Sequence, residues 1–281
     1  LFPALGDGWV HLDAPSGMQV PEQVATAVST ALRAPVSDPG GAFPASQRAE
    51  VILADARRAV ADLVGGDPAG VVIGPNVPVL LGRLAEALAA EWVVGDEITV
   101  SRLDHQQNIA PWLRASQRPG AVVRWGEIDI ETCELPAWQY DSIVSSRTKV
   151  VAVTAASGAV GTRPDVRKIA EIAHKVGALM VVDASAAAPY MPLDLADMGA
   201  DVVALSATAW GGPSVGALVF ADPGLLDRLS ACALDPGCHG PERLELGQHP
   251  YPLLAGLVAS VNYLALLDDA ASGGRRERLR A

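Results

Sequence analysis

Short runs of β-branched and aliphatic residues recur along the chain and alternate with longer stretches of helical periodicity. The clearest example is a helical pattern over residues 164–176, which lies between apolar runs at 150–154 and 179–183. This alternation is typical of βαβ units and predicts an α/β fold with a parallel sheet. Because the runs are apolar throughout, we expect helices to cover both faces of that sheet. The predicted strands are residues 71–73, 98–100, 121–123, 150–154, 179–183, 202–205 and 217–220.

Helical patterns also precede and follow these strands. Pro21 suits the first position of a helix whose apolar face carries Val24, Val28, Ala31 and Leu32. Further helices are predicted over residues 47–64, 77–91 and 253–267, and a turn-rich loop over residues 35–44.

The length of the chain bounds its domain organisation. At 281 residues it is long enough for one large domain together with part of a second. We expect an N-terminal segment over residues 1–20, a large domain over 21–267 and the start of a smaller domain over 268–281. A domain that closes on itself seldom ends just as a charged helix begins, so the small C-terminal domain is predicted to be truncated.

The charge balance excludes two classes of partner. The chain carries 21 Lys and Arg against 32 Asp and Glu, a formal net charge of −11. Such a field repels nucleic acid and anionic membranes, so we expect neither as a partner. Residues 246–267 lack acidic and basic side chains apart from His249, a stretch long enough to span a bilayer. Pro250, Pro252 and Asn262 favour instead a buried helix of a soluble protein starting near residue 253.

The cysteines bear on location and on metal binding. Cys133, Cys232 and Cys238 are odd in number and far apart, which argues against a disulfide framework and fits a reducing cytoplasm. No signal peptide opens the sequence, so the cytoplasm is the predicted location. Cys232 and Cys238 with His239 raise the alternative of a metal site. Their spacing lacks the CxxC form, which favours ordinary loop cysteines and no metal.

Polar residues follow several predicted strands at the end where α/β proteins place their chemistry. Asp183 ends the strand at 179–183, and a buried carboxylate there either caps a turn or pairs with a ligand cation. Gly74 and Asn76 follow the first strand and precede a helix, a context that suits either a phosphate cradle or a simple βα turn. His105 follows another strand, where a histidine is most often a loop or capping residue. The strand at 202–205 runs into a loop of small residues that begins at Ser206.

The segment around His105 is the most specific motif in the chain. Residues 103–112 resemble the Glu-His-x-x-Asn-x-x-Pro-Trp segment of class V aminotransferases and cysteine desulfurases, which are pyridoxal-phosphate-dependent transferases of fold type I. Asn108, Pro111 and Trp112 match that pattern, and segments 11–15, 154–161 and 243–249 resemble other motifs of the family in the same order. The resemblance implies a large domain of the pyridoxal-phosphate-transferase type, with a seven-stranded, mostly parallel sheet.

The resemblance also implies roles for residues around pyridoxal phosphate (PLP). His105 takes the position of the histidine that stacks on the cofactor ring, and Asp183 that of the aspartate paired with the protonated pyridine nitrogen. Ser206 would bind the phosphate, as would the turn of Gly74 and Asn76, where the family has Gly-Thr-Thr. Gln248 replaces a threonine that reaches the phosphate of the neighbouring subunit, so the resemblance implies a homodimer.

The loop after residue 205 departs from the family at the decisive position. The Ser-x-His-Lys segment of the family becomes residues 206–209, so that Thr208 replaces the histidine and Ala209 the lysine that carries PLP as a Schiff base. An alanine side chain can neither attack an aldehyde nor shuttle a proton. Ala186 likewise replaces a glutamine that bonds the 3′ oxygen of the cofactor.

Three hypotheses follow from this combination. The first is an aminotransferase or desulfurase relative that binds PLP or pyridoxamine phosphate (PMP) weakly and non-covalently through Asp183, His105 and Ser206. The second is a pseudoenzyme, a catalytically silent homodimer that serves as a partner or regulatory protein. The third is a lysine-independent enzyme, with His105 as base, that acts on a pre-formed adduct of PLP or PMP.

Overall fold

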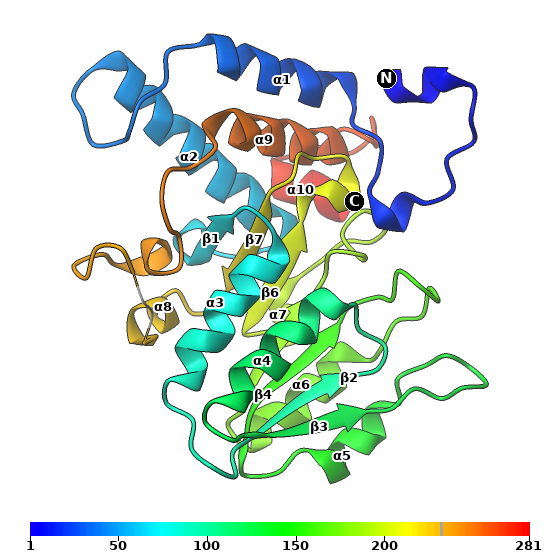
Figure 1. The fold of residues 1–281 in the computed structure, drawn as a ribbon. Coiled ribbons are helices and arrows are strands. Elements are labelled where there is room, and N and C mark those ends of the chain that lie inside the picture. Colours follow the sequence, from blue (N-terminus) through cyan, green and yellow to red (C-terminus); the bar gives the residue numbers. More distant parts are fainter. Residues whose placement is uncertain (231–232) are drawn as a thin grey trace.

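A seven-stranded sheet forms the centre of the structure, a computed structural model that describes residues 1–230 and 233–281 (Figure 1). The strand order is β1-β7-β6-β5-β4-β2-β3. β7 pairs antiparallel with β1 and β6, and the other neighbouring strands pair in parallel. This confirms the predicted α/β fold with a mostly parallel sheet. The strands are β1 (Val71–Gly74), β2 (Glu97–Ser101), β3 (Val122–Gly126), β4 (Thr148–Thr154), β5 (Leu179–Asp183), β6 (Val202–Ser206) and β7 (Gly216–Phe220).

Helices cover both faces of the sheet, as the apolar strands predicted. In Figure 1, α3 (Val77–Ala89) and α4 (Ala110–Gln117) lie in front of the sheet and α6 (Val166–Lys175) lies behind it. The face that α6 covers is also packed against α2 (Pro44–Val64) and α9 (Tyr251–Ala265). The remaining helices are α1 (Glu22–Arg33), α5 (Tyr140–Ile143), α7 (Leu195–Met198), α8 (Gly224–Arg228) and α10 (Arg275–Arg280).

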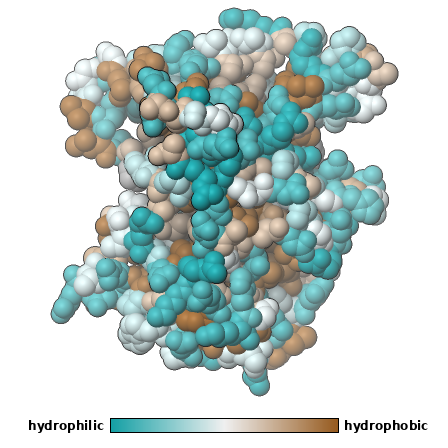
Figure 2. All heavy atoms as spheres, turned by 180° about the vertical axis from the view of Figure 1, so that it is seen from behind, coloured by the Kyte–Doolittle hydropathy of each residue, from teal (hydrophilic) through white to brown (hydrophobic). Residues whose placement is uncertain are grey.

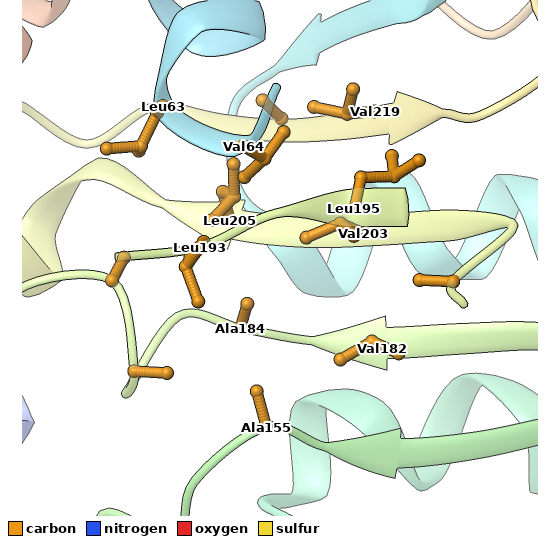
Figure 3. Packing of buried hydrophobic residues seen from close by; sticks show 14 of the residues in the cluster. Leu63, Val64, Ala155, Val182, Ala184, Leu193, Leu195, Val203, Leu205 and Val219 are labelled. Carbon is orange, nitrogen blue, oxygen red and sulfur yellow. The ribbon is translucent and has the colours of Figure 1, made fainter. Parts of the chain in front are cut away.

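Two hydrophobic clusters hold the helices to the sheet, one on each face. Figure 3 shows the cluster behind the sheet, where Val182, Val203 and Val219 come from the neighbouring strands β5, β6 and β7. Leu63 and Val64 reach the same cluster from the end of α2. Side chains far apart in the sequence thus form a continuous core that fixes the strand ends.

The differences from the predictions include the boundaries of two helices and the burial of one strand. α2 begins at Pro44 and not at residue 47, because the fixed φ of proline suits the first turn of a helix. α9 begins and ends two residues earlier than predicted, at Tyr251 and Ala265. β3 alternates between exposed and half-buried residues, so the expectation that every strand is covered on both faces is wrong for this strand at the edge of the sheet.

The predicted apolar stretch 246–267 contains α9, which has 15 residues and buries Leu254, Leu257 and Val261. Among the described helices, none combines the length and the apolar character needed to cross a bilayer. Figure 2 shows the face opposite to that of Figure 1, on which hydrophilic side chains predominate and hydrophobic ones lie between them in small groups.

The last helix, α10 (Arg275–Arg280), packs against α2 and α9. In α10, Arg275 donates from Nε to Asp62 Oδ2 at 2.7 Å, and Arg276 donates from Nη2 to Asp194 Oδ2 at 2.8 Å. These ion pairs hold α10 against α2 and the segment before α7. The division into residues 1–20, 21–267 and 268–281 stays a prediction.

Candidate active site

The carboxyl ends of the parallel strands meet at one edge of the sheet. Thr154 of β4 pairs in register with Asp183 of β5, and Asp183 with Ala204 of the neighbouring β6. Asp183 and Ser206, the last residues of β5 and β6, therefore lie at the same edge. The structure thus places Asp183 and Ser206 at one edge of the sheet, as predicted from the strand ends, and the candidate site is built there.

Asp183 is a buried carboxylate that accepts hydrogen bonds from neutral donors. Asp183 as a whole is only 3% exposed. The backbone N–H of Ser185 donates to Oδ1 at 3.0 Å, and Gln107 donates from Nε2 to Oδ2 at 2.7 Å. Among the described residues, no Lys, Arg or His lies within ion-pairing distance of this carboxylate. The site therefore holds a buried negative charge without a cationic side chain to balance it.

Gln107 reaches Asp183 from a turn that follows β2. It lies in the short 3₁₀ helix Gln106–Asn108, for which His105 is the N-cap. The Nδ1 atom of His105 accepts a hydrogen bond from the backbone N–H of Gln107 at 3.2 Å. His105 is exposed, and its side chain caps the turn. Gln107, the second residue of that turn, points to Asp183. Its predicted stacking on a cofactor ring stays a prediction.

Asp104, next to His105, is the centre of a second polar cluster. Asn108 donates from Nδ2 to Asp104 Oδ1 at 2.6 Å, and the Ser101 hydroxyl donates to Oδ2. Burial raises the pKa of Asp104 from 3.8 to about 7, and the negative charge of Asp183 contributes to the rise. Trp112 donates from Nε1 to Asn108 Oδ1 at 3.3 Å. Part of the motif at residues 103–112 therefore forms a buried network that positions the turn.

Tyr140 is a further buried polar residue near Asp104. Its residue is fully buried, and its hydroxyl has no hydrogen-bond partner among the described residues. Burial raises the pKa of Tyr140 above its ordinary value, and the charge of Asp104 adds to this shift. A neutral hydroxyl thus lies near Asp104, and the charge of Asp183 acts on Asp104 in turn. Sequence patterns assigned no role to Tyr140, Asp104 or Gln107. Asp104 and Gln107 nevertheless lie within the motif at residues 103–112, and the polar amide of Gln107 was visible there as a possible hydrogen-bond donor.

The loop after β6 contains the position expected for a lysine. It begins with the 3₁₀ helix Ala207–Trp210, in which Ala209 is half-buried and packs against the hydrophobic core. The Ser206 and Thr208 hydroxyls lie 2.9 Å apart and bond to each other. The carbonyl of Thr208 accepts a hydrogen bond from the backbone N–H of Met18 at 3.0 Å. The N-terminal segment therefore contacts the loop, and the hydroxyls of Ser206 and Thr208 form their hydrogen bond within it.

Gly211 closes that loop in a conformation that requires glycine. Its φ is +79°, and a Cβ atom there would lie 2.8 Å from the carbonyl oxygen of Gln19. The close approach of residues 18–21 to the loop therefore depends on the absence of a side chain at this position.

The turn after β1 is tightly packed. Asn76 Oδ1 accepts a hydrogen bond from the backbone N–H of Val79 at 3.0 Å and so caps α3. A Cβ atom at Gly74 would lie 2.6 Å from the side chain of Leu80. Pro75 and Pro78 supply no backbone N–H. These contacts favour the simple βα turn, and the phosphate role of Gly74 and Asn76 stays a prediction.

Gln248 lies in a segment anchored by a buried carboxylate. Its Nε2 donates to Asp38 Oδ1 at 2.5 Å in an exposed position. Nearby Glu245 is buried and accepts from Arg57 at 2.7 Å and from the backbone N–H of Ile73 at 2.7 Å. His249 lies 3.1 Å from the same carboxylate. This ion cluster holds residues 243–249 against β1, whereas Gln248 itself is engaged at the surface.

The metal alternative concerned Cys232, Cys238 and His239. Across residues 1–230 and 233–281, no His, Cys, Asp and Glu side chains are grouped as a metal site would require. Cys238 is buried with a free thiol, and Cys232 lies outside the described residues.

The arrangement of strands and strand-end residues corresponds to a known family. Residues 10–234 match the aminotransferase class V family, and the chain belongs to it. An uncharacterized protein of Mycobacterium tuberculosis is 54% identical over 279 residues, which cover 99% of this chain and 70% of that protein. The chain therefore spans about 70% of the length of this relative.

Solved structures place the fold among the cysteine desulfurases. The desulfurase CsdA of Escherichia coli is 26% identical with a TM-score of 0.84, and the match covers 95% of this chain and 70% of CsdA. A lysine-to-alanine variant of the C-DES protein, in which glycine is covalently linked to the PLP cofactor, matches with 21% identity and a TM-score of 0.83 over 99% of this chain and 75% of that one. Structural neighbours of this fold thus bind PLP.

The residues present fit PLP at one end only. Asp183 is a buried anion without a cationic partner in the described chain, which suits a protonated ring nitrogen. Residue 209 offers a methyl group, so a covalent bond to the cofactor aldehyde is chemically excluded at that position. The site is therefore compatible with a non-covalently held pyridine ring.

Proposed function

We propose that this chain is a class V aminotransferase relative that binds PLP or PMP weakly and non-covalently and lacks ordinary lysine-dependent catalysis. The observation that carries the proposal is the contrast between Asp183 and Ala209. The buried carboxylate that would pair with the ring nitrogen is present, while the amine that would attack the aldehyde is absent.

Asp183 supports binding for an electrostatic reason. A buried carboxylate whose donors are an amide and a backbone N–H gains more from a cationic N–H donor, because charge-assisted hydrogen bonds are roughly twice as strong as neutral ones. A bound PLP ring supplies an electron sink for carbanion chemistry. In this chain Asp183 would hold and orient that ring, His105 would lie at its face, and Ser206 would contact the phosphate.

A second function is favoured by a specific observation at the other end of the site. The Ser206 and Thr208 hydroxyls bond to each other, and Gln248 is engaged with Asp38 at the surface. Because these side chains already bond within the chain, fewer groups are free to hold a phosphate, which favours a catalytically silent protein; on this reading the chain is a homodimeric partner or regulatory protein. Light scattering tests the dimer, and a monomeric mass would contradict it.

Calorimetric titration with PLP and with PMP separates the two functions. We expect heat of binding for both ligands in the first case, and loss of that heat in Asp183→Ala. Borohydride reduction of the PLP-treated protein, followed by peptide mapping, should find no modified residue 209. Absence of binding for both ligands would reject the first function and leave the second.

A further inference from the structure

We infer that Gln107 is an internal competitor for the cofactor site, in which its side-chain amide holds the oxygen of Asp183 that a ring nitrogen would use. We call this contact the Gln107–Asp183 latch. The inference rests on the proposed function, because it concerns ligands that pair with Asp183. Its ligand class is a pyridine ring with a protonated nitrogen.

Each oxygen of the carboxylate already accepts one hydrogen bond, and burial restricts access to its remaining acceptor positions. The backbone of Ser185 occupies Oδ1 at 3.0 Å, and Gln107 Nε2 occupies Oδ2 at 2.7 Å. Gln107 Nε2 also lies 3.5 Å from Ser185 Oγ, so the amide sits between the two residues. Since Asp183 is only 3% exposed, a ring N–H has to enter where the amide now lies.

The orientation of the amide is determined by charge. With its carbonyl oxygen turned to Oδ2, Gln107 would place two acceptors against each other, whereas its NH₂ group donates. The latch thus gives a buried charge a neutral donor in the absence of a cation.

The turn that carries Gln107 is held on both sides. The preceding His105 caps it through Nδ1, and the following Asn108 is fully buried and bonded to Asp104 and Trp112. Gln107 is therefore directed to Asp183 by the network around it. The neighbouring Gln106 is exposed, which makes it a matched control.

Competition has a defined thermodynamic consequence. A ligand that requires the open form binds with an affinity reduced by the fraction of molecules in that form. Removing the amide should therefore raise the affinity for PMP, by about tenfold if the latch is as strong as a typical hydrogen bond to a charged group. The weakness of cofactor binding in this chain would then have a second cause besides the missing lysine.

The test compares PMP binding by the wild-type chain with that of Gln107→Ala, Gln107→Asn and Gln106→Ala, using calorimetry. We expect about tenfold tighter binding for Gln107→Ala. Gln107→Asn, whose shorter side chain cannot span the 2.7 Å contact, should behave in the same way. Gln106→Ala should bind as the wild type does. Equal or weaker binding by Gln107→Ala would overturn the inference.

A PMP analogue with carbon in place of the ring nitrogen locates the effect. It should show no gain in affinity from Gln107→Ala, and an equal gain would overturn competition at Asp183. In the wild type, the side-chain amide NMR signal of Gln107 should shift when PMP is added, and an unmoved signal at saturation would also contradict displacement.

The outcomes for the proposed function and for the latch are separable. Wild-type binding with no gain in Gln107→Ala rejects the latch and supports the function. Binding by Gln107→Ala alone supports the latch and rejects cofactor binding by the natural chain. Absence of binding in both proteins rejects both.

Discussion

The two ends of the candidate site differ in how their polar groups are satisfied. At the ring-nitrogen end, Asp183 is bonded to Gln107, and Asp104 to Ser101 and Asn108, in a network that joins the ends of β2 and β5. At residues 206–209, where the resemblance to the family places the lysine and which we call the lysine end, Ser206 and Thr208 bond to each other within one loop.

This difference distinguishes residues that the folded structure needs from a residue that only catalysis would need. The network at the ring-nitrogen end positions buried groups that would be costly to leave unpaired, so it has a structural reason to persist without catalysis. At position 209 the alanine side chain is half-buried and packs against the hydrophobic core, which requires no amine. If catalysis were lost, substitutions would therefore be tolerated first at the lysine end.

Restoring the amine should produce the largest effect. Ala209→Lys places a lysine in the loop after β6, at the sheet edge that Asp183 shares. We expect PLP to form a borohydride-fixable bond at this residue, detected by peptide mass and absent from the wild type. The control Ala196→Lys adds a lysine on the exposed surface of α7 and should give no such specific bond. A missing adduct in Ala209→Lys would show that the ring-nitrogen end does not hold the cofactor.

Removing the carboxylate should produce the next largest effect. Asp183→Ala eliminates the anionic partner of the ring nitrogen, and we expect affinity for PMP to fall by about a hundredfold, the loss typical of a buried charge-assisted contact. Asp183→Asn keeps the size of the side chain and should lose most of the same affinity. Calorimetry with both variants checks the expectation, and unchanged affinity would remove Asp183 from the site.

Asp104 offers a test of the network by pH. Its pKa is raised from 3.8 to about 7, so between these values the folded protein retains a proton that the unfolded chain has lost. Its contribution to the free energy of unfolding is greatest below pH 4, declines as the pH rises to about 7 and is constant above. Asp104→Asn carries no such titration and should be more stable than the wild type at pH 8.

The gain in Asp104→Asn is expected to be on the order of 2 kcal/mol at pH 8, with part of the linkage energy lost to weaker hydrogen bonding. Urea denaturation at pH 8 and pH 4 measures it, and the difference should vanish at the lower pH. A difference that does not depend on pH would show that Asp104 is not desolvated.

The smallest effects are expected at the lysine end. Ser206→Ala and Thr208→Val each remove one member of a half-buried hydroxyl pair, which costs about 0.5–1 kcal/mol of stability. Because Ser206 would contact the phosphate through a single neutral hydroxyl, we expect Ser206→Ala to lower affinity for PMP by at most about tenfold, and Thr208→Val by less. A loss as large as that in Asp183→Ala would show that Ser206 contributes as much as the buried carboxylate, and would remove the contrast between the two ends.

Sequence patterns predicted the order of elements and the edge where the site lies. Apolar runs of strand length marked each strand, and parallel pairing then placed Asp183 and Ser206 at the same edge. The pairing of Gln107 with Asp183 was not predictable, because 76 residues separate them and neither local pattern depends on the other. The boundary error at Pro44 arose from loop signals that also suit a helix start.

The sequence by itself determined that residue 209 has no amine, since no folding can supply a nucleophile that the side chain lacks. It also determined the βαβ alternation, because apolar periodicity is a local property of the chain. Only the tertiary structure decided that the Gln107 amide donates to the Asp183 carboxylate and that burial raises the pKa of Asp104 to about 7. Both depend on distances and burial between segments that the sheet brings together, and hydrogen bonding and desolvation act through space and not along the chain.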